Sequence, residues 1–381
     1  YLFSFKMYTR VLLLIALATV VCHAKVGCMN RDGEPVDWWF MSKLGNGVDG
    51  ANSGSKTLYF DATQTATPRV GNVTQETALK QTVMQLNLYT SEAPRNDTIY
   101  MVWNDQTYKT LQNALDGKMT SHSSHHGDRT AHAKGMFAVG ADSAFLISHS
   151  TPGFPLAHDI APNHWMFFDH QMVYGQHYFC VNVDVSTVED LADLMQFNNY
   201  WIYDTYVPDA LRTKFPTVAA LADGAFKRGS GYLKLKSQQG VELIAFAKNG
   251  DNGIDLFEDM VAPILNDNLT VMCWCGGHFG YHCMPQDCKD EPIVEPSTPQ
   301  QNETFYNLDV VNVMNITLAG MDWQVFNEHS KWAVTQRKRW FCPADINREY
   351  TQRNRGGGSI CIHNTDIWKT MSHAVTAKKQ C

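Results

Sequence analysis

The sequence predicts an α/β or α+β protein built from two domains or two fused halves. Segments of strand length alternate with segments of helical pattern, which favours mixed sheets covered by helices. The chain has 381 residues. About 355 of them follow an N-terminal leader, which is long for a single hydrophobic core. The triplet His-x-Lys occurs at residues 132–134 and again at residues 329–331, as expected of two related halves.

A hairpin is the first element expected beside a triplet. Residues 135–139 and 144–148 are apolar and flank the turn sequence Gly-Ala-Asp-Ser, so the second strand should deliver His149. Residues 177–185 predict a further strand. Ser186-Thr187-Val188-Glu189 has the spacing of a capping box, which predicts a helix that continues to about Phe197.

The remaining elements follow the same alternation of strands and helices. The Pro- and Asn-containing stretch 198–216 marks the expected boundary, and we divide the chain into halves 25–205 and 206–381. Residues 291–302 have the composition of a surface loop. The second half is expected to contain strands at 241–247, 269–274, 332–335, 340–342 and 360–362, and helices at 254–265 and 366–377.

Residues 1–24 have the composition of a secretory signal. Lys6 and Arg10 give a basic start, residues 11–21 are apolar, and Cys22-His23-Ala24 offers small residues for cleavage. The apolar run is too short to span a bilayer, and no later segment predicts a membrane helix. The first methionine is Met7, which leaves open that residues 1–6 are an upstream translation artefact. We expect an exported protein, either lysosomal or secreted.

Sequons and cysteines agree with export. Five Asn-x-Ser/Thr sequons predict glycosylation, at Asn72, Asn96, Asn268, Asn302 and Asn315. Ten cysteines occur, and nine remain when Cys22 leaves with the signal. An oxidising compartment favours disulfides for most of these, and the odd number leaves at least one thiol unpaired or intermolecular.

The charge balance is expected to depend strongly on pH. The formal net charge of −7 becomes −9 when the signal takes Lys6 and Arg10 away. An acidic protein binds nucleic acid poorly at pH 7, because phosphate contacts dominate that affinity. Full protonation of the 14 histidines that remain would bring the charge to +5. We therefore hypothesise that the protein meets a polyanion in an acidic compartment.

The two triplets are the candidate catalytic residues. Side chains at positions i and i+2 of an extended strand point to the same face. His132 would therefore lie beside Lys134, and His329 beside Lys331. Two such pairs meeting at a pseudo-twofold axis would supply a nucleophile, a proton donor and two fixed cations, which phosphodiester cleavage needs.

A polar side chain follows each triplet at a similar distance. His149 lies 17 residues after His132, and Asn347 lies 18 residues after His329. A catalytic histidine must be held in one tautomer, and a hydrogen-bonding neighbour does this. We therefore expect these two residues to orient the two histidines.

These motifs resemble the deoxyribonuclease II family. The first motif is His132-Ala-Lys-Gly with residues 147–155, and the second is residues 328–332 with 345–348 and 355–361. Further matching stretches are Pro35-Val-Asp-Trp38, Val102-Trp-Asn-Asp-Gln106 and Ala245-Phe-Ala-Lys248. The resemblance extends from about Cys28 to Cys381. The family is a single-chain relative of the phospholipase D superfamily, with two similar halves, each a mixed sheet flanked by helices, that share one active site.

The resemblance implies endonucleolytic hydrolysis of DNA at acidic pH, without a metal or cofactor, leaving 3′-phosphate ends. His132 would be the nucleophile that forms a phosphohistidine. His329 would protonate the leaving 5′-oxygen and then deprotonate the attacking water. Lys134 and Lys331 would stabilise the charge on the phosphoryl oxygens. The assignment of nucleophile and acid to these two halves is by analogy and is open to reversal.

Other positions complete or depart from the family pattern. Asn347 and His149 would orient the site, with Asp345 as a further candidate. The family often has an acidic residue six positions after the first lysine, where this chain has Gly140. Its Ser-Lys-Trp-Cys is Ser-Lys-Trp-Ala333 here. Neither departure affects the proposed chemistry directly.

The resemblance also implies the disulfide pattern. Cys28–Cys180 and Cys342–Cys361 match family bridges. Cys381 is expected to pair with a cysteine of the 273–288 segment, and we favour Cys288. This leaves three cysteines without an assigned pair, namely Cys273, Cys275 and Cys283.

Three other clusters have both a functional and an ordinary interpretation. The cysteines of segment 273–288, with His278 and His282, have zinc-like spacing, but an exported protein favours disulfides. His122, His125 and His126 would suit a metal or DNA phosphates, yet their Ser/His/Gly stretch is typical of a solvated loop. The basic runs 227–228 and 337–339 are typical of solvated faces.

Two further functions stay open beside the nuclease. One is a phosphodiesterase that acts on another substrate, such as a phospholipid. The other is a secreted DNA-binding or host-interacting protein with weak or no catalysis, which the intact triplets disfavour. The expected partner is DNA, with no membrane and no obligatory metal, and a homodimer stays open.

Overall fold

The computed structural model describes residues 25–48, 54–75, 77–88, 92–122, 130–160, 165–274, 276–277, 280–281, 284 and 308–378. Several sequence predictions fall outside these ranges and are not tested by the structure. They are the signal 1–24, the loop 291–302 with its sequon Asn302, His125, His126, His278, His282, Cys275, Cys283, Cys288 and Cys381.

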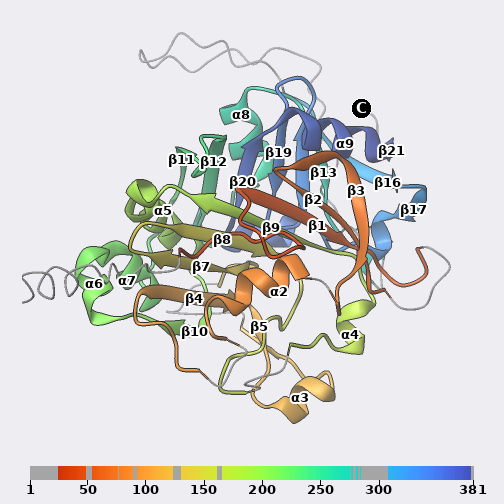
Figure 1. The fold of residues 1–381 in the computed structure, drawn as a ribbon. Helices are drawn as coiled ribbons and strands as arrows, with labels where there is room; N and C mark the ends of the chain where they lie inside the picture. The colour runs from red at the N-terminus through yellow and green to blue at the C-terminus, as the bar shows by residue number, and fades with distance from the viewer. Residues whose placement is uncertain are drawn as a thin grey trace, which may run out of the picture.

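The first large sheet has eight strands in the order β10-β4-β7-β8-β9-β1-β2-β3 (Figure 1). Every neighbouring pair is antiparallel. The predicted mixed character is therefore absent from this sheet. The strands are β1 Trp38–Lys43, β2 Lys56–Asp61, β3 Gln64–Asn72, β4 Thr98–Asn104, β7 Lys134–Gly140, β8 Ala144–His149, β9 Gln176–Val183 and β10 Ile202–Tyr206.

The second large sheet is mixed, because β13 and β16 are parallel while its other pairs are antiparallel. Its order is β11-β12-β20-β19-β18-β13-β16-β17, and β21 also pairs with β16. Its strands are β11 Ser230–Lys236, β12 Glu242–Lys248, β13 Leu269–Met272, β16 Val310–Leu318, β17 Met321–Gln324, β18 Trp332–Thr335, β19 Trp340–Pro343, β20 Gly357–His363 and β21 Val375–Lys378. Two small ribbons are β5 Gln106–Thr107 with β6 Thr120–Ser121, and β14 Gly276–Gly277 with β15 Gly280–Tyr281.

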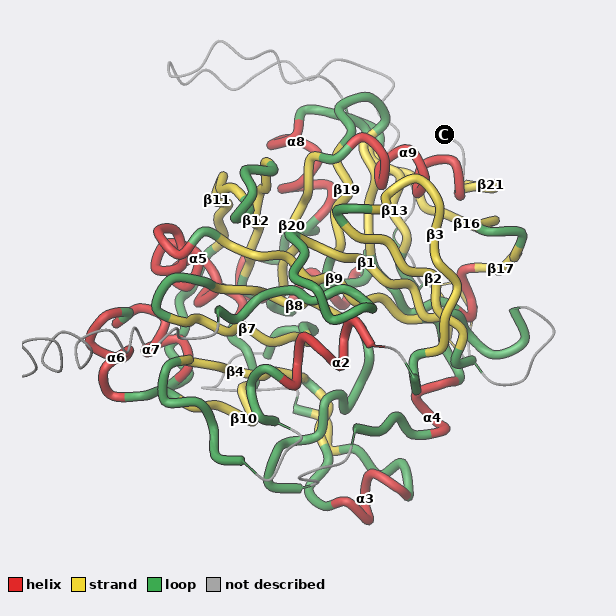
Figure 2. The backbone as a smooth tube through the Cα atoms, in the orientation of Figure 1, coloured by secondary structure: helices red, strands yellow, loops and turns green. Residues whose placement is uncertain are grey.

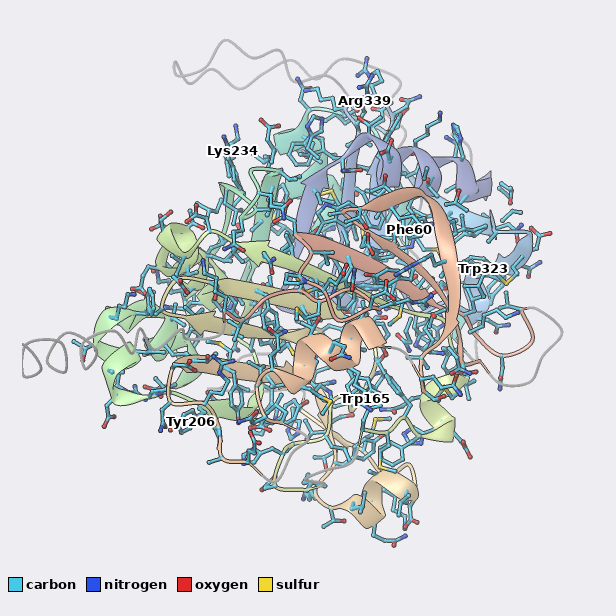
Figure 3. The ribbon with its side chains drawn as sticks, viewed as in Figure 1. Phe60, Trp165, Tyr206, Lys234, Trp323 and Arg339 are labelled. Carbon is cyan, nitrogen blue, oxygen red and sulfur yellow. A yellow bond between two sulfur atoms is a disulfide. The ribbon has the colours of Figure 1, made fainter. Side chains whose placement is uncertain are left out.

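The two sheets pack face to face, with helices on the outer faces and at the ends (Figure 2). Both faces of the first sheet are buried, so successive residues such as Phe40 and Met41 are both apolar. Phe40 meets Phe341 of the second sheet edge to face, with ring centroids 4.9 Å apart. The labelled Phe60 also belongs to this shared core (Figure 3). The arrangement is an α+β fold with one core common to both sheets.

Helices cover the outer faces and the ends of the sandwich. Apolar residues of α2 pack on the outer face of the first sheet. Those of the π-helical turn Phe257–Val261 and α8 pack on the outer face of the second. α5, α7 and α9 contribute to the core between the sheets. The helix bounds are α2 Thr77–Met84, α3 Leu111–Leu115, α4 Asp169–Met172, α5 Val188–Met195, α6 Asp209–Lys214, α7 Pro216–Ala222, α8 Ala262–Leu265 and α9 Thr365–Ala374.

Five strands of one sheet correspond to five strands of the other. The blocks β4-β7-β8-β9-β1 and β13-β18-β19-β20-β12 have the same spatial order, the same order along the chain and antiparallel pairing throughout. Cys180 and Cys361 each occupy the fifth position of the equivalent strands β9 and β20. Two similar halves are thus present. The boundary after residue 205 remains a proposal.

Most predicted elements around the triplets are present. The hairpin is β7–β8, the predicted strand 332–335 is β18, and the disulfides Cys28–Cys180 and Cys342–Cys361 both form. The terminal helix ends earlier than predicted, at Ala374, because the chain continues as β21 against β16. No helix in the described ranges is long and apolar enough to cross a membrane.

The predicted capping box is wrong. A 3₁₀ turn, Val185–Thr187, precedes α5, and its cap is Asp184, whose Oδ1 accepts the Ser186 N–H at 2.9 Å. Thr187 makes no side-chain cap to α5. Glu189 instead accepts the backbone N–H groups of Thr217 and Val218, at the first turn of α7. The Glu189 carboxylate therefore caps α7 through a tertiary contact and does not take part in the capping box that the local sequence predicted for α5.

Candidate active site

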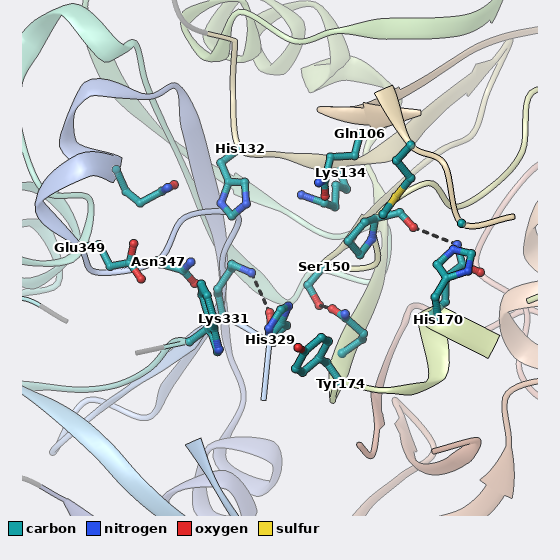
Figure 4. A pocket seen from close by; sticks show the side chains of 17 residues that line it. Gln106, His132, Lys134, Ser150, His170, Tyr174, His329, Lys331, Asn347 and Glu349 are labelled. Carbon is teal, nitrogen blue, oxygen red and sulfur yellow. Dashed lines mark hydrogen bonds between the residues drawn. The ribbon is translucent and has the colours of Figure 1, made fainter. Parts of the chain in front are cut away.

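All four triplet residues line one cavity of about 370 Å³ (Figure 4). Neither triplet lies within a strand. His132 precedes β7, whose first residue is Lys134, and Lys331 directly precedes β18. The lysines are buried, with 2% and 4% of their surface exposed, whereas both histidines are partly exposed at the cavity wall. The two His-x-Lys pairs are therefore brought together, as the repeat predicted.

Each histidine is tied through its backbone to the opposite half. The His132 N–H donates to the carbonyl oxygen of Gly356 at 2.9 Å, and the His329 N–H donates to that of Gly175 at 2.8 Å. Both glycines are needed for this close approach. A Cβ at Gly356 would lie 2.0 Å from the Asn198 carbonyl oxygen, and one at Gly175 would lie 2.2 Å from Glu328 Oε2.

A buried carboxylate organises the first triplet. Asp105 follows β4, and its Oδ1 accepts a hydrogen bond from Lys134 Nζ at 2.6 Å. Its Oδ2 accepts from Arg355 Nη2 of the second half at 3.0 Å and lies 4.0 Å from His132 Nε2. Burial would raise the pKa of Asp105, but attraction to Lys134, His132 and Arg355 holds it well below its usual value. The carboxylate is thus a fixed anion that joins the halves.

The second triplet has a different environment. Lys331 Nζ donates to the His329 carbonyl oxygen at 2.7 Å. Tyr174 stacks on the His329 ring with centroids 4.0 Å apart, and Trp274 lies 4.8 Å from it. Glu328 is buried and accepts hydrogen bonds from the Ser330 N–H and the Trp323 indole. Aromatic rings rather than a carboxylate therefore flank this imidazole.

Burial and cationic neighbours keep the site's basic groups easily deprotonated. Burial, with Lys134, holds the pKa of His132 well below its usual value despite the opposing pull of Asp105. Burial, with Lys331 and Lys134, lowers the pKa of His329 to about 3. Burial also lowers the pKa of Lys331 to about 7. A bound anion would raise these pKa values and favour the protonated forms of these groups, so the cavity suits an anionic ligand.

The three orienting candidates occupy different places. Asn347 lines the cavity and is buried, and its Oδ1 has no hydrogen-bond partner among the described residues. His149 pairs with Lys134 across β7 and β8 but does not line the cavity. Its Nδ1 accepts the Thr151 N–H at 3.2 Å, so the proton of the neutral ring is on Nε2.

Asp345 lies in a separate small cavity of about 30 Å³ between the sheets. Its Oδ1 accepts from Ser148 Oγ at 3.2 Å, and its Oδ2 accepts from the Gly358 N–H at 3.1 Å. Burial raises its pKa to about 7 despite these hydrogen bonds. This position makes Asp345 a bridge between the halves, because Ser148 belongs to β8.

Sequence reasoning gave no role to several residues of the site. Asp105 and Arg355 fall in stretches that carry the resemblance to the family. Asp105 also directly follows a strand, a position from which a role in the site could have been predicted. Tyr174 and Trp274 have no local signal, because their contact with His329 joins distant segments. Gln176 and Ser150 also line the cavity and bond to one another at 2.5 Å.

The other clusters contribute little to this site. His122 stacks on Trp201 with centroids 3.9 Å apart, and its Nε2 lies 2.7 Å from Thr107 Oγ1. Cys273 is buried, and burial raises the pKa of its thiol to about 12. Over the part of the chain that the structure describes, no group of three His, Cys, Asp or Glu side chains could hold a metal ion.

Both basic runs lie on the surface. Lys227 and Arg228 form ion pairs with Asp193 and Asp251. Residues 337–339 are exposed in the turn between β18 and β19, and Arg339 projects outward in Figure 3. These locations agree with solvated faces rather than with the cavity.

Comparison with known proteins identifies the fold's family. The family described as Deoxyribonuclease II matches residues 27–381. The chain is 26% identical to deoxyribonuclease-2-alpha of Sus scrofa over 97% of this chain and 94% of that protein. It is 27% identical to cell-death-related nuclease 7 of Caenorhabditis elegans over 94% and 89%, and 26% identical to plancitoxin-1 of Acanthaster planci over 99% of both. Because the match covers nearly the whole chain, this protein belongs to the deoxyribonuclease II family, hydrolases that act on the phosphodiester bonds of DNA.

Proposed function

We propose that this chain cleaves DNA endonucleolytically through a phosphohistidine intermediate and leaves 3′-phosphate ends. Family membership implies acid deoxyribonuclease activity, and the proposal adds the mechanism. The observation that carries it is the convergence of both His-x-Lys pairs on one cavity. A phosphodiester bound there would meet a nucleophile, a proton donor and two ammonium groups.

The proposed reaction has two steps. A ring nitrogen of His132 attacks phosphorus, and the bond to the 5′-oxygen breaks as His329 donates its proton to that oxygen. His329 then takes a proton from water, whose oxygen attacks phosphorus and breaks the phosphorus–nitrogen bond. The product keeps the phosphate on the 3′-oxygen, and both histidines return to their starting states. Lys134 and Lys331 stabilise the phosphoryl charge, and Asn347 and His149 are proposed to orient the site.

The electrostatics support an acidic optimum. The low pKa of His132 keeps its ring neutral and nucleophilic. The low pKa of His329, lowered chiefly by burial, means that acidic pH is needed to protonate it. A bound phosphate anion would raise that pKa, because it compensates the charges of Lys331 and Lys134. These ammonium groups supply the positive charge that a divalent metal supplies in many nucleases, so no metal is required by the proposal.

Cleavage of supercoiled plasmid at pH 5 in EDTA tests this proposal. The parent protein should nick the plasmid, whereas His132→Ala and His329→Ala should lose the activity. His363→Ala is the control, because His363 is exposed and pairs with Glu242 outside the cavity. A phosphorylated peptide containing residue 132, recovered after rapid quenching, would identify the intermediate.

Three outcomes would contradict the proposal. Activity that returns only with added divalent metal would exclude the metal-free mechanism. DNA binding without cleavage by the parent protein would favour a binding protein instead. Cleavage of a phospholipid but not of DNA would favour the other phosphodiesterase.

Two disulfides and family membership indicate an extracytoplasmic location. We propose the lysosome or secretion as the destination, with glycans on the sequons. Asn96 is exposed, and Asn72, Asn268 and Asn315 are partly exposed. Removal of N-glycans by an endoglycosidase should reduce the apparent mass of the native protein.

A further inference from the structure

Two fully buried lysines outside the cavity bind backbone carbonyl groups. Lys43 Nζ donates to the carbonyl oxygens of Leu44, Gly54 and Met172 at 3.0, 2.8 and 3.2 Å. Lys248 Nζ donates to those of Gln352, Arg353 and Arg355 at 3.3, 2.9 and 2.6 Å. An ammonium group has three N–H donors, and each lysine satisfies all three with the backbone of neighbouring loops. Burying two charges in this way is costly, so the arrangement calls for a role.

The two lysines occupy equivalent positions of the repeated strand block. Lys43 is the last residue of β1 and pairs with Gln176, the first residue of β9. Lys248 is the last residue of β12 and pairs with Gly357, the first residue of β20. The residues just before these partners are Gly175 and Gly356. These are the glycines whose carbonyl oxygens accept the N–H groups of the catalytic histidines.

Each lysine therefore holds the loop that reaches across to the other half. Lys43 binds residue 172, and the following residues Tyr174 and Gly175 contact His329 by ring stacking and by a backbone hydrogen bond. Lys248 binds the carbonyl groups of residues 352, 353 and 355, and the carbonyl oxygen of Gly356 then accepts the His132 N–H. The same loop carries Arg355 to Asp105.

We propose that Lys43 and Lys248 are positioning residues, Lys43 for His329 and Lys248 for His132. Each keeps a strand-entry loop at the place where its glycine carbonyl can fix the histidine of the opposite half. Burial lowers the pKa of Lys43 to about 7 and that of Lys248 to about 8, so both keep three donors at acidic pH. The titratable and charged groups that face them are Glu328 and His329 for Lys43, and Asp255, Asp259 and Arg353 for Lys248. The inference rests on the proposed roles of the two histidines.

Two substrates with different leaving groups distinguish the proposed roles of the two lysines. DNA needs a protonated 5′-oxygen to leave, whereas thymidine 3′-(4-nitrophenyl phosphate) releases a nitrophenolate that needs no proton. Lys43→Met and Lys248→Met keep an unbranched side chain that is one atom shorter and remove its donors. Misplacement of a catalytic group by about 1 Å can cost about 100-fold, so we expect kcat on DNA to fall about 10- to 100-fold in both.

The burst of nitrophenolate in a single turnover is the diagnostic measurement. In Lys43→Met its rate should stay within about threefold of the parent, because only the proton donor is displaced. In Lys248→Met it should fall as much as the DNA rate, because the nucleophile is displaced. The ratio of the single-turnover rate constants on the two substrates, each measured with enzyme in excess, is unaffected by the fraction of protein that folds. If methionine prevents folding, Lys→Gln, which keeps two donors on a shorter side chain, gives the same comparison with smaller expected losses.

The control is Val139→Ala, a buried core truncation near the far end of β7. It should lower stability without changing the ratio. Equal losses on both substrates in both lysine variants, or rates like those of the control, would overturn the inference. A reversed pattern would keep the positioning role and exchange the roles of His132 and His329. Retained DNA cleavage by His132→Ala would instead refute the proposed function, whatever the lysine variants do.

Discussion

Replacing Asp345 with asparagine should stabilise the protein at neutral pH but not at acidic pH. Burial raises the pKa of this carboxyl from 3.8 to about 7 in the folded protein. Between these values the folded state holds a proton that the unfolded chain releases. The bound proton therefore contributes fully to the stability of the folded protein below about pH 4, and this contribution is lost as the pH rises to about 7. The shift corresponds to at most about 4 kcal/mol at about 1.4 kcal/mol per pKa unit.

Asparagine imitates the protonated acid. Its oxygen can accept the Gly358 N–H, and its amide can donate to Ser148 Oγ, the two groups that Asp345 contacts. We therefore expect Asp345→Asn to match the parent within about 1 kcal/mol at pH 4 and to exceed it by about 1–4 kcal/mol at pH 8.

Denaturant unfolding at pH 4 and pH 8, with the disulfides intact, measures both differences. Ser359→Ala is a suitable control, because its hydroxyl bonds to the nearby Pro343 carbonyl oxygen and does not titrate. The reasoning is refuted if Asp345→Asn is less stable than the parent at both pH values. That result would mean that Asp345 is ionised and favourably paired in the folded state.

Three further predictions follow from the site and the disulfides. Asp105→Asn should lower kcat and reduce the free energy of unfolding by roughly 3–5 kcal/mol, because Lys134 and Arg355 lose their buried partner. The control Asp116→Asn, at an exposed position, should change neither quantity. Because burial lowers the pKa of Lys331 to about 7, the loss of its ammonium adds to the deprotonation of His329 as the pH rises. Lys331→Arg keeps its charge, so kcat should decline less steeply above pH 7 in a kcat–pH profile than it does in the parent. Replacing Cys28 and Cys180 with serine should cost about 5 kcal/mol, and replacing Cys342 and Cys361 about 3 kcal/mol, because these bridges close loops of 152 and 19 residues; equal losses in denaturant unfolding would contradict this chain-entropy argument.

Local pattern was sufficient where local interactions decide the structure. The β7–β8 hairpin follows from two apolar runs around turn chemistry, and β18 follows from a short apolar run. The predicted capping box is absent because Glu189 accepts backbone N–H groups of α7, which lies 28 residues further along the chain. Lys248 falls in a stretch that matches the family, but neither it nor Lys43 could be given a role from the sequence, because a buried ammonium bound only to carbonyl groups has no sequence motif.

The triplets illustrate how the meeting of two His-x-Lys pairs in one cavity can be predicted from a partly incorrect geometry. The prediction placed His132 and Lys134 on one face of a strand, yet the strands begin at Lys134 and after Lys331. Alternation along a strand therefore does not fix where the histidines point. Their backbones are held by Gly356 and Gly175 of the opposite halves, so each imidazole depends on a loop far away in the sequence. The repeat predicted that two half-sites exist, and the crossed contacts explain why neither half alone would present a completed one.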